Sequence, residues 1–195
     1  VFRRAAGAPL SSNRHRILAL DTSFSMQYAG RHKRSQSEAL ALIDRLRSGD
    51  RAQVLTFGPG VRVLLDPTDD RAALRAAVNS LQPSRSRNSY GDLGQSLRAL
   101  AQSSSLPAEV HVLSDFQNSA MPGRFADLSL PATATLTPHN VATDDSRNWC
   151  VESLKGDTRL YEKGRARLEA VIAGFNTPAA TRRVTLSIDG RQLAS

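Results

Sequence analysis

One short stretch decides how the chain folds: Leu18-Ala-Leu-Asp21-Thr-Ser23-Phe-Ser25-Met26. Its first part is apolar and predicts a buried strand. Its second part places one carboxylate and two hydroxyls at alternate positions, and alternate residues of an extended backbone point to the same side. Asp21, Ser23 and Ser25 can therefore converge on one hard cation, because Mg²⁺ prefers oxygen ligands. We interpret this stretch as a binding site at the end of a strand.

The sequence around this stretch predicts an α/β domain, because apolar runs of strand length alternate with segments of helical periodicity. Strands are expected over residues 16–20, 52–57, 61–65, 109–113 and 132–136, and helices over 35–46, 70–81 and from 92 onward, with a short helical turn over 122–128. The turn Gly58-Pro-Gly60 makes the third strand antiparallel to the second, and Thr68 or Asp69 is expected to cap the second helix. This order is typical of a mostly parallel, doubly wound (Rossmann-like) sheet flanked by helices.

The predicted secondary structure changes after about residue 147. Strand-like runs cover 149–154, 165–175 and 182–188, and no helical segment lies between them. This pattern predicts an antiparallel, Ig-like β-sandwich module. We therefore expect a lead-in over residues 1–13, the α/β domain over 14–140 and a β-rich module over 148–195, which we expect to be truncated.

Composition excludes some classes of function. The net charge of +8 comes from arginines scattered through every segment, without the interleaved aromatics that a nucleic-acid platform needs, so no nucleic-acid partner is expected. The single cysteine, Cys150, excludes an internal disulfide and a cysteine metal cage. No run approaches the roughly 20 apolar residues of a membrane span. Membrane segments can still lie outside this chain on either side.

Three polar loops are expected at one edge of the sheet, because ligands bind at the carboxyl ends of the strands in open α/β sheets. Asp21 follows the first strand, Asp115 follows the strand over 109–113, and the polar loop 84–92 precedes a helix. A cation there would gain two carboxylates and two hydroxyls and keep one coordination position open. The start of the helix near Asp92 adds amide groups that favour an anion.

These residues resemble the von Willebrand factor type A family. Residues 21–26 are similar to its Asp-x-Ser-x-Ser motif, which opens a metal-ion-dependent adhesion site. Residues 91–94 (Gly-Asp-Leu-Gly) and 113–115 (Leu-Ser-Asp) stand where the family carries its second and third metal-site loops. The resemblance covers about residues 14–136 and implies a non-enzymatic module for protein–protein interaction.

The resemblance also implies roles for individual residues. Ser23 and Ser25 would ligate the metal through their hydroxyls, and Asp21 and Asp115 would hold it directly or through water. The ion would be Mg²⁺, or Mn²⁺ or Ca²⁺. Its open position would take an Asp or Glu side chain from a partner protein.

The second loop departs from the family pattern. Gly91 occupies the position where the family usually has a threonine. Ser89 is the candidate substitute ligand, with Ser86 and Tyr90 as alternatives. The departure raises a second hypothesis, in which the domain binds no metal and serves as a structural module of a bacterial membrane-associated assembly.

Three further residues are candidates for contact with a partner. Phe24, between the two serines, either packs inward or lies exposed beside the metal. Tyr90 and Asp92 belong to the second loop, and Asp92 is also a candidate helix cap. We name all three as the expected partner-binding residues.

A narrower resemblance concerns cellular context. Residues 113–117 (Leu-Ser-Asp-Phe-Gln) and the passage over 148–153 resemble bacterial membrane-anchored proteins of the Bat (aerotolerance) type. In those proteins hydrophobic segments precede the type A domain, and Arg3-Arg4 suits a position just outside a membrane. The expected location is the bacterial inner membrane, on a side that the residues do not specify, with the anchor outside this chain.

Catalysis is not expected. Ser23, His111 and Asp115 contain the residue types of a hydrolase triad, but the chain has no Gly-x-Ser-x-Gly nucleophile elbow. The histidines lie on different segments without a shared spacing, which argues against a histidine metal site.

Overall fold

The computed structural model describes residues 13–117, 120–122, 124, 129–142, 147–156 and 167–194. The chain divides into two compact units, residues 1–143 and 144–195. Each unit has its own sheet structure, and the candidate site belongs to the first.

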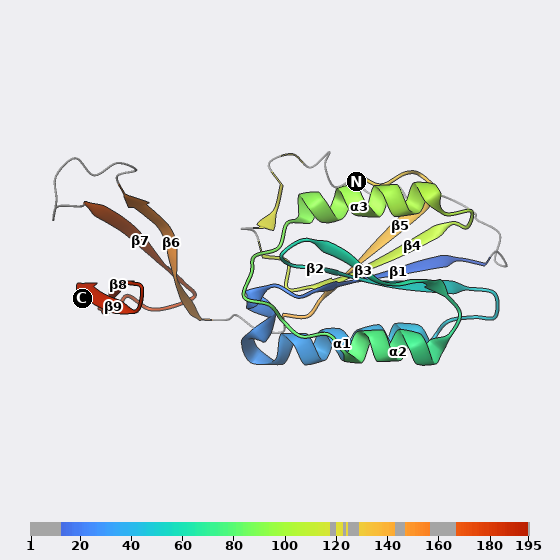
Figure 1. Cartoon of the computed structure of the whole chain (residues 1–195), viewed down its shortest axis with the longest axis horizontal. Coiled ribbons are helices and arrows are strands. Elements are labelled where there is room, and N and C mark those ends of the chain that lie inside the picture. Colours follow the sequence, from blue (N-terminus) through green and yellow to red (C-terminus); the bar gives the residue numbers. More distant parts are fainter. Residues whose placement is uncertain are drawn as a thin grey trace. The chain divides into compact units, whose positions relative to one another are not determined.

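A five-stranded sheet forms the centre of the first unit, in the order β3-β2-β1-β4-β5 (Figure 1). Its strands are β1 (His15–Asp21), β2 (Arg51–Phe57), β3 (Val61–Thr68), β4 (Ala108–Ser114) and β5 (Ala134–Asn140). β2 and β4 both run parallel to β1, β5 runs parallel to β4, and β3 is antiparallel to β2. The predicted mostly parallel α/β fold, with an antiparallel strand after Gly60, is therefore confirmed.

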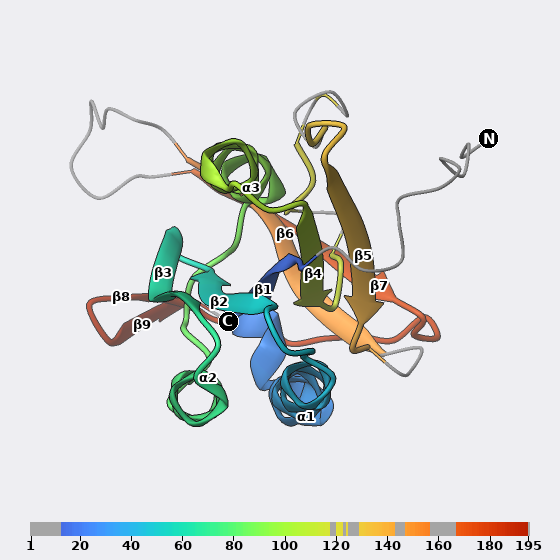
Figure 2. The ribbon, with the colours of Figure 1, turned by 90° about the vertical axis from the view of Figure 1, so that its right-hand side faces the viewer.

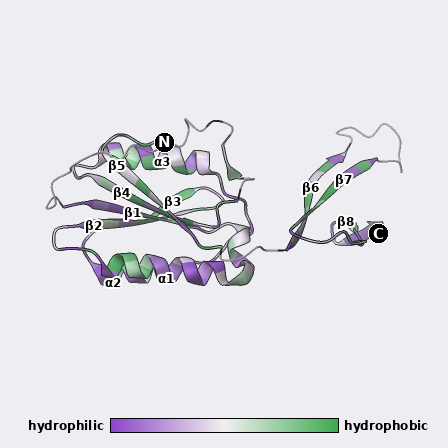
Figure 3. Ribbon diagram, turned by 180° about the vertical axis from the view of Figure 1, so that it is seen from behind, coloured by the Kyte–Doolittle hydropathy of each residue, from purple (hydrophilic) through white to green (hydrophobic). Residues whose placement is uncertain are grey.

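Helices cover both faces of this sheet (Figure 2). The first face carries α1 (Arg31–Asp44) and α2 (Arg71–Asn79), the second carries α3 (Tyr90–Ser103), and a 3-10 segment, η1 (Phe24–Gly30), links β1 to α1. Leu18 and Leu20 of β1 pack in the core under α1 and α2, whereas Ile17 and Ala19 pack under α3. Hydrophilic and hydrophobic residues mix along α1 and α3, as in helices with one buried face (Figure 3).

The helices begin at other residues than the sequence predicted. Asp70, rather than Thr68 or Asp69, caps α2, and its Oδ1 accepts hydrogen bonds from the amides of Ala72 and Ala73 at 2.8 and 3.0 Å. α3 begins at Tyr90 instead of near residue 92, and α1 begins at Arg31 instead of near residue 35. The helical turn predicted over 122–128 falls largely outside the described residues.

The second unit contains two antiparallel strand pairs. β6 (Asn148–Gly156) pairs with β7 (Leu168–Phe175), and β8 (Leu186–Ile188) pairs with β9 (Arg191–Ala194). The predicted change to antiparallel strands is thus confirmed. Within this unit the guanidinium of Arg182 lies over the ring of Trp149, 5.2 Å from its centroid.

No helix in the described part of the chain is both long enough and apolar enough to cross a membrane.

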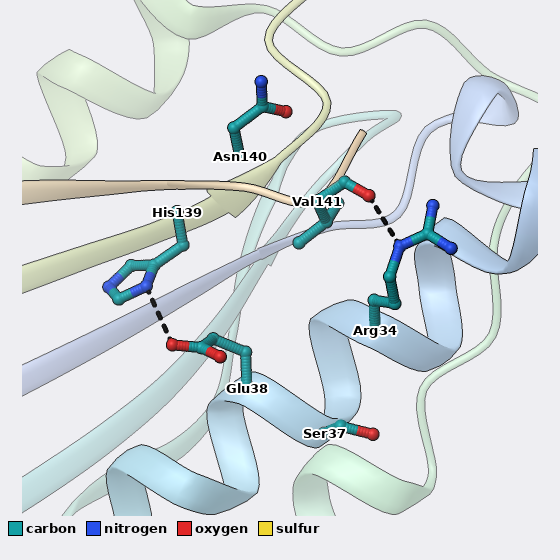
Figure 4. A pocket seen from close by; sticks show the side chains of 6 residues that line it. All are labelled: Arg34, Ser37, Glu38, His139, Asn140 and Val141. Atoms are coloured by element: carbon teal, nitrogen blue, oxygen red, sulfur yellow. Dashed lines mark hydrogen bonds and ion pairs between the residues drawn. The ribbon is translucent and has the colours of Figure 1, made fainter. Parts of the chain in front are cut away.

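Two histidines lie between α1 and the β4–β5 edge of the sheet. His111 Nδ1 and His139 Nε2 are 2.9 Å apart, and His139 Nδ1 lies 3.2 Å from Glu38 Oε1. A pocket of about 430 Å³ opens beside His139, with the side chains of α1 on one side and the end of β5 on the other (Figure 4). Its lining residues are Arg34, Ser37, Glu38, His139, Asn140 and Val141. His139 therefore reaches the surface while His111 stays buried.

The surroundings of His111 oppose its protonation. Burial lowers its pKa, Glu109 partly offsets this, and His139 and Arg16 lower the pKa further. The folded chain therefore keeps His111 neutral over a pH range in which an unfolded histidine takes up a proton.

We predict that the free energy of unfolding decreases as the pH falls from 7.5 to 5.5. Unfolded His111 gains a proton near its ordinary pKa of 6.5, whereas folded His111 resists protonation until a lower pH. The unfolded state then binds more protons, so stability is lost as the pH falls below 6.5, by about 1.4 kcal/mol for each unit of pKa lowering. Thermal unfolding followed by circular dichroism measures the effect.

Two variants isolate the contribution of His111. His111→Gln should make the pH dependence shallower, and the remaining slope is expected from His15, whose pKa burial also lowers. His32→Gln, which changes a histidine bonded to the carbonyl of Leu81 outside this pair, should leave it unchanged. Equal pH profiles for the His111→Gln variant and the original chain would contradict the interpretation.

Candidate metal centre

The candidate site lies where β1 and β4 end side by side. These neighbouring strands are parallel, so Asp21 at the end of β1 and Asp115 just after β4 reach the same edge of the sheet. The chain leaves β1 toward β2 on one side, while β4 lies on the other. This edge is therefore a topological switch point, the usual ligand site of open α/β sheets.

Asp21 is the centre of a hydrogen-bond network. Its side chain is buried, and its Oδ1 accepts from the Ser23 amide at 2.8 Å. Its Oδ2 accepts from Asn88 Nδ2 at 2.7 Å and from the Ser114 hydroxyl. One carboxylate thus joins all three loops that the sequence placed at this edge.

Burial raises the pKa of Asp21, and the nearby charge of Asp115 raises it further. Hydrogen bonds from Ser114 and Ser23 oppose this rise by stabilising the charged form. Negative charge on Asp115 therefore makes Asp21 harder to ionise.

The two motif hydroxyls lie together. Ser23 Oγ and Ser25 Oγ are 3.1 Å apart, and Ser23 is almost fully buried. Adjacent oxygen ligands of an octahedral Mg²⁺, at about 2.1 Å from the ion, are separated by about 3 Å. The spacing of the hydroxyls therefore fits two neighbouring positions on one small cation.

Asp115 differs from Asp21 in having an unused acceptor. Its Oδ2 accepts a hydrogen bond of 2.6 Å from Arg31 Nη1 in a buried ion pair. Its Oδ1 is buried and has no hydrogen-bond partner among the described residues. The same Arg31 nitrogen lies 3.4 Å from the Ser25 carbonyl, which places the Asp115 carboxylate beside the serine motif. The oxygen donor set therefore fits a hard divalent cation.

The second loop uses its serine differently from the expected ligand role. Ser89 Oγ caps α3 by accepting a hydrogen bond of 3.2 Å from the Asp92 amide. A β-carbon added at Gly91 would lie 3.5 Å from Pro122 Cβ and 3.7 Å from Ser89 Oγ, which are ordinary contacts. Position 91 therefore has room for a side chain, although the sequence supplies none.

The three expected partner-contact residues separate into two groups. Phe24 is 60% exposed and Asp92 is also exposed, so both are accessible to a partner. Tyr90 is only 4% exposed and lies in the core, with its ring stacked on Phe116 and its hydroxyl 2.7 Å from Ser114 Oγ. The expectation of a surface role for Tyr90 does not match this placement, since a ring at the first turn of α3 packs against β4.

Burial raises the pKa of Tyr90, so its hydroxyl stays protonated. Because the Ser114 hydroxyl donates its proton to Asp21, the Tyr90 hydroxyl donates to Ser114. This chain of donors stabilises the Asp21 carboxylate from the core side.

Sequence reasoning missed three participants in the site: Arg31, Asn88 and Ser114. Ser114 had a usable signal, because it stands between a predicted strand and Asp115. Arg31 and Asn88 had none, since their partners are distant in the sequence. Among the described residues, no group of three or more His, Cys, Asp or Glu side chains is arranged to hold a metal, so the candidate centre depends on serine hydroxyls.

Comparisons with known proteins identify the family of the first unit. The model of the von Willebrand factor type A domain family matches residues 17–117, just over half of the chain. A von Willebrand factor type A protein from Catenulispora acidiphila is similar in structure, with 25% identity and a TM-score of 0.54 over 66% of this chain and 33% of that one. This chain thus spans only a third of that relative. Comparison with curated protein sequences gives no match.

Two further solved structures have lower identity. An aerotolerance-related membrane protein from Bacteroides fragilis aligns over 84% of this chain and 82% of its own, with 16% identity and a TM-score of 0.57, and it shares the fold. Proximal thread matrix protein 1 from the mussel byssus, solved with a zinc-occupied MIDAS motif, has 16% identity and a TM-score of 0.46 over 52% of this chain and 28% of its own. The family match and the shared fold lead to one conclusion: the chain belongs to the von Willebrand factor type A domain family.

Proposed function

We propose that the first unit is a non-enzymatic protein-interaction module that uses a divalent cation to bind an acidic side chain of a partner protein. The observation that carries this proposal is the buried, unpartnered Oδ1 of Asp115, in a carboxylate that shares Arg31 with the Ser25 carbonyl, together with the paired hydroxyls of Ser23 and Ser25. A buried acceptor without a partner costs about 1–3 kcal/mol. A bound cation would offset that cost.

Each residue of the site has a separate role in this proposal. Ser23, Ser25 and Asp115 would hold the ion, which we expect to be Mg²⁺, Mn²⁺ or Ca²⁺. Asp21 would orient Ser23 by accepting a hydrogen bond from the Ser23 backbone amide, and its negative charge would help to stabilise the bound ion. The bound ion supplies a Lewis-acidic position for a carboxylate. The exposed ring of Phe24 would contact the partner around that position.

We predict that Mn²⁺ or Mg²⁺ stabilises the chain after treatment with EDTA. Cation at a hundredfold excess over its dissociation constant adds about 2.7 kcal/mol to the free energy of unfolding. For a chain of this length, that corresponds to a rise of about 5–10 °C in the unfolding temperature. Differential scanning fluorimetry and isothermal titration calorimetry measure the two effects.

Ser25→Ala is the informative variant, because the Ser25 hydroxyl bonds only Ser23 among the hydrogen bonds that the structure gives it. It should abolish the stabilisation by cation and leave the metal-free chain folded. Ser37→Ala removes an exposed hydroxyl that bonds the Lys33 carbonyl, and it should respond to cation like the original chain. A full response in the Ser25→Ala variant would argue against this ligand set.

Gly91→Thr tests the role of the second loop. It restores the hydroxyl that the family usually has there, at a position where a β-carbon meets only ordinary contacts. We predict that it tightens Mn²⁺ binding about tenfold, corresponding to about 1.4 kcal/mol. Gly91→Val has nearly the same shape without the hydroxyl and should give no gain in calorimetry. Equal affinities for the two variants would mean that position 91 contributes no ligand.

A metal-free scaffold is the second candidate function, and a specific observation favours it. Arg31 already pairs with Asp115, and the two oxygens of Asp21 are occupied by Ser23, Asn88 and Ser114. Absence of any response to Mg²⁺ and Mn²⁺ would select this function over the metal-dependent one.

The cellular context is also a proposal. The fold shared with an aerotolerance-related membrane protein supports a bacterial, membrane-anchored protein whose anchor lies outside residues 1–195. It equally supports a type A domain over 14–140 followed by a β-rich, Ig-like module over 148–195. The side of the membrane is left open.

Membrane anchoring has a direct test. The complete product of the gene should sediment with the inner-membrane fraction and resist a carbonate wash. The 195-residue chain on its own should stay in the supernatant. Recovery of the complete product from the supernatant would contradict the proposed anchor.

A further inference from the structure

Arg31 forms the only ion pair that the described residues give Asp115. Its Nη1 lies 2.6 Å from Asp115 Oδ2, and the two side chains are 9% and 2% exposed. A short hydrogen bond between opposite charges away from water is among the stronger contacts in a protein. The guanidinium thus neutralises the carboxylate that the proposed cation needs.

The position of Arg31 in α1 is unusual for a cation. It is the first residue of the helix, where the positive end of the helix dipole disfavours positive charge. The chain reaches it through Ala29 and Gly30, both left-handed, with φ values of 47° and 72°. Helix α1 does not need a cation here, so the pairing with Asp115 explains the placement.

The guanidinium also contacts an exposed aromatic ring while it pairs with Asp115. Arg31 Cζ is 5.2 Å from the centroid of the Tyr28 ring, and Tyr28 is 52% exposed. A guanidinium that leaves Asp115 can remain over this ring at the surface. Arg31 therefore has an alternative contact that does not require a buried charge to stay unpaired.

We propose that Arg31 is an internal counter-ion that competes with the divalent cation for Asp115 and so weakens the affinity of the site. This inference rests on the proposed metal-dependent function. In the metal-free chain Arg31 satisfies Asp115 and stabilises the rim. When the cation binds, the guanidinium moves away from Asp115 and keeps its contact with Tyr28 at the surface, because two like charges repel each other strongly in a buried site.

The test compares Mn²⁺ binding by the full chain and by two variants, Arg31→Gln and Arg34→Gln. Arg31→Gln removes the competing charge and keeps hydrogen-bond donors. Arg34 lies on the same helix one turn later, where it donates to the carbonyls of Ala29 and Val141 and contacts no carboxylate of the site. It is therefore a matched control for loss of an arginine from α1.

We expect Arg31→Gln to bind MnCl₂ at least tenfold more tightly in isothermal titration calorimetry. It should also unfold at a lower temperature than the original chain in EDTA and show a larger rise with Mn²⁺. Arg34→Gln should keep the original affinity. Folding of Arg31→Gln only in the presence of Mn²⁺ would equally support the proposal, since the cation would then replace the lost charge.

The failures of the two proposals are distinguishable. Equal Mn²⁺ affinity of Arg31→Gln and the original chain overturns the role of Arg31 and leaves the metal site standing. No Mn²⁺ binding by either folded protein overturns both proposals. If Arg31→Gln stays unfolded even with Mn²⁺, Arg31→Lys decides, because lysine keeps the charge but makes fewer directed contacts. The lysine ammonium pairs with Asp115 less firmly than the guanidinium does, so a tightening of threefold or more supports the inference and any smaller change overturns it.

Discussion

The buried carboxylate of Asp21 is the contact on which this edge of the sheet depends. It accepts hydrogen bonds from the backbone amide of Ser23, the side-chain amide of Asn88 and the hydroxyl of Ser114, which lie after β1, before α3 and at the end of β4. Such charge-assisted bonds are stronger than neutral ones, and an unpaired donor here would carry a full desolvation cost. The hydrogen bonds that satisfy the buried Asp21 carboxylate therefore also fix the geometry of the serine motif.

Asp115 lies a short distance away but is satisfied in another way. Its counter-charge is Arg31, which comes from the start of α1 rather than from a neighbouring loop. Only one of its oxygens takes part in that pair. Both oxygens of Asp21 are thus engaged by the chain, whereas one oxygen of Asp115 keeps the capacity for an additional contact.

Much of the fold followed from patterns that act over short distances. The apolar run at Leu18–Leu20, the turn at Gly58-Pro-Gly60 and the helical spacing after Ser35 each depend on neighbours in the sequence, so their strands and helices were predictable. The caps were harder, because Ser89 and Asp70 compete with adjacent polar residues for the same role. Contacts across the fold were not predictable: Arg31 and Asp115 are 84 positions apart, and no local pattern pairs them.

Tyr90 was expected to contact a partner at the surface, but it lies in the core. An aromatic residue in a polar loop suggests a surface contact, but the cap at Ser89 starts the helix at Tyr90 and turns its ring toward β4. The hydroxyl then supports Ser114, which supports Asp21. The aromatic side chain therefore acts on the site from inside the core. Of the three residues expected to contact a partner, only Phe24 in η1 and Asp92 in the first turn of α3 are therefore exposed to solvent.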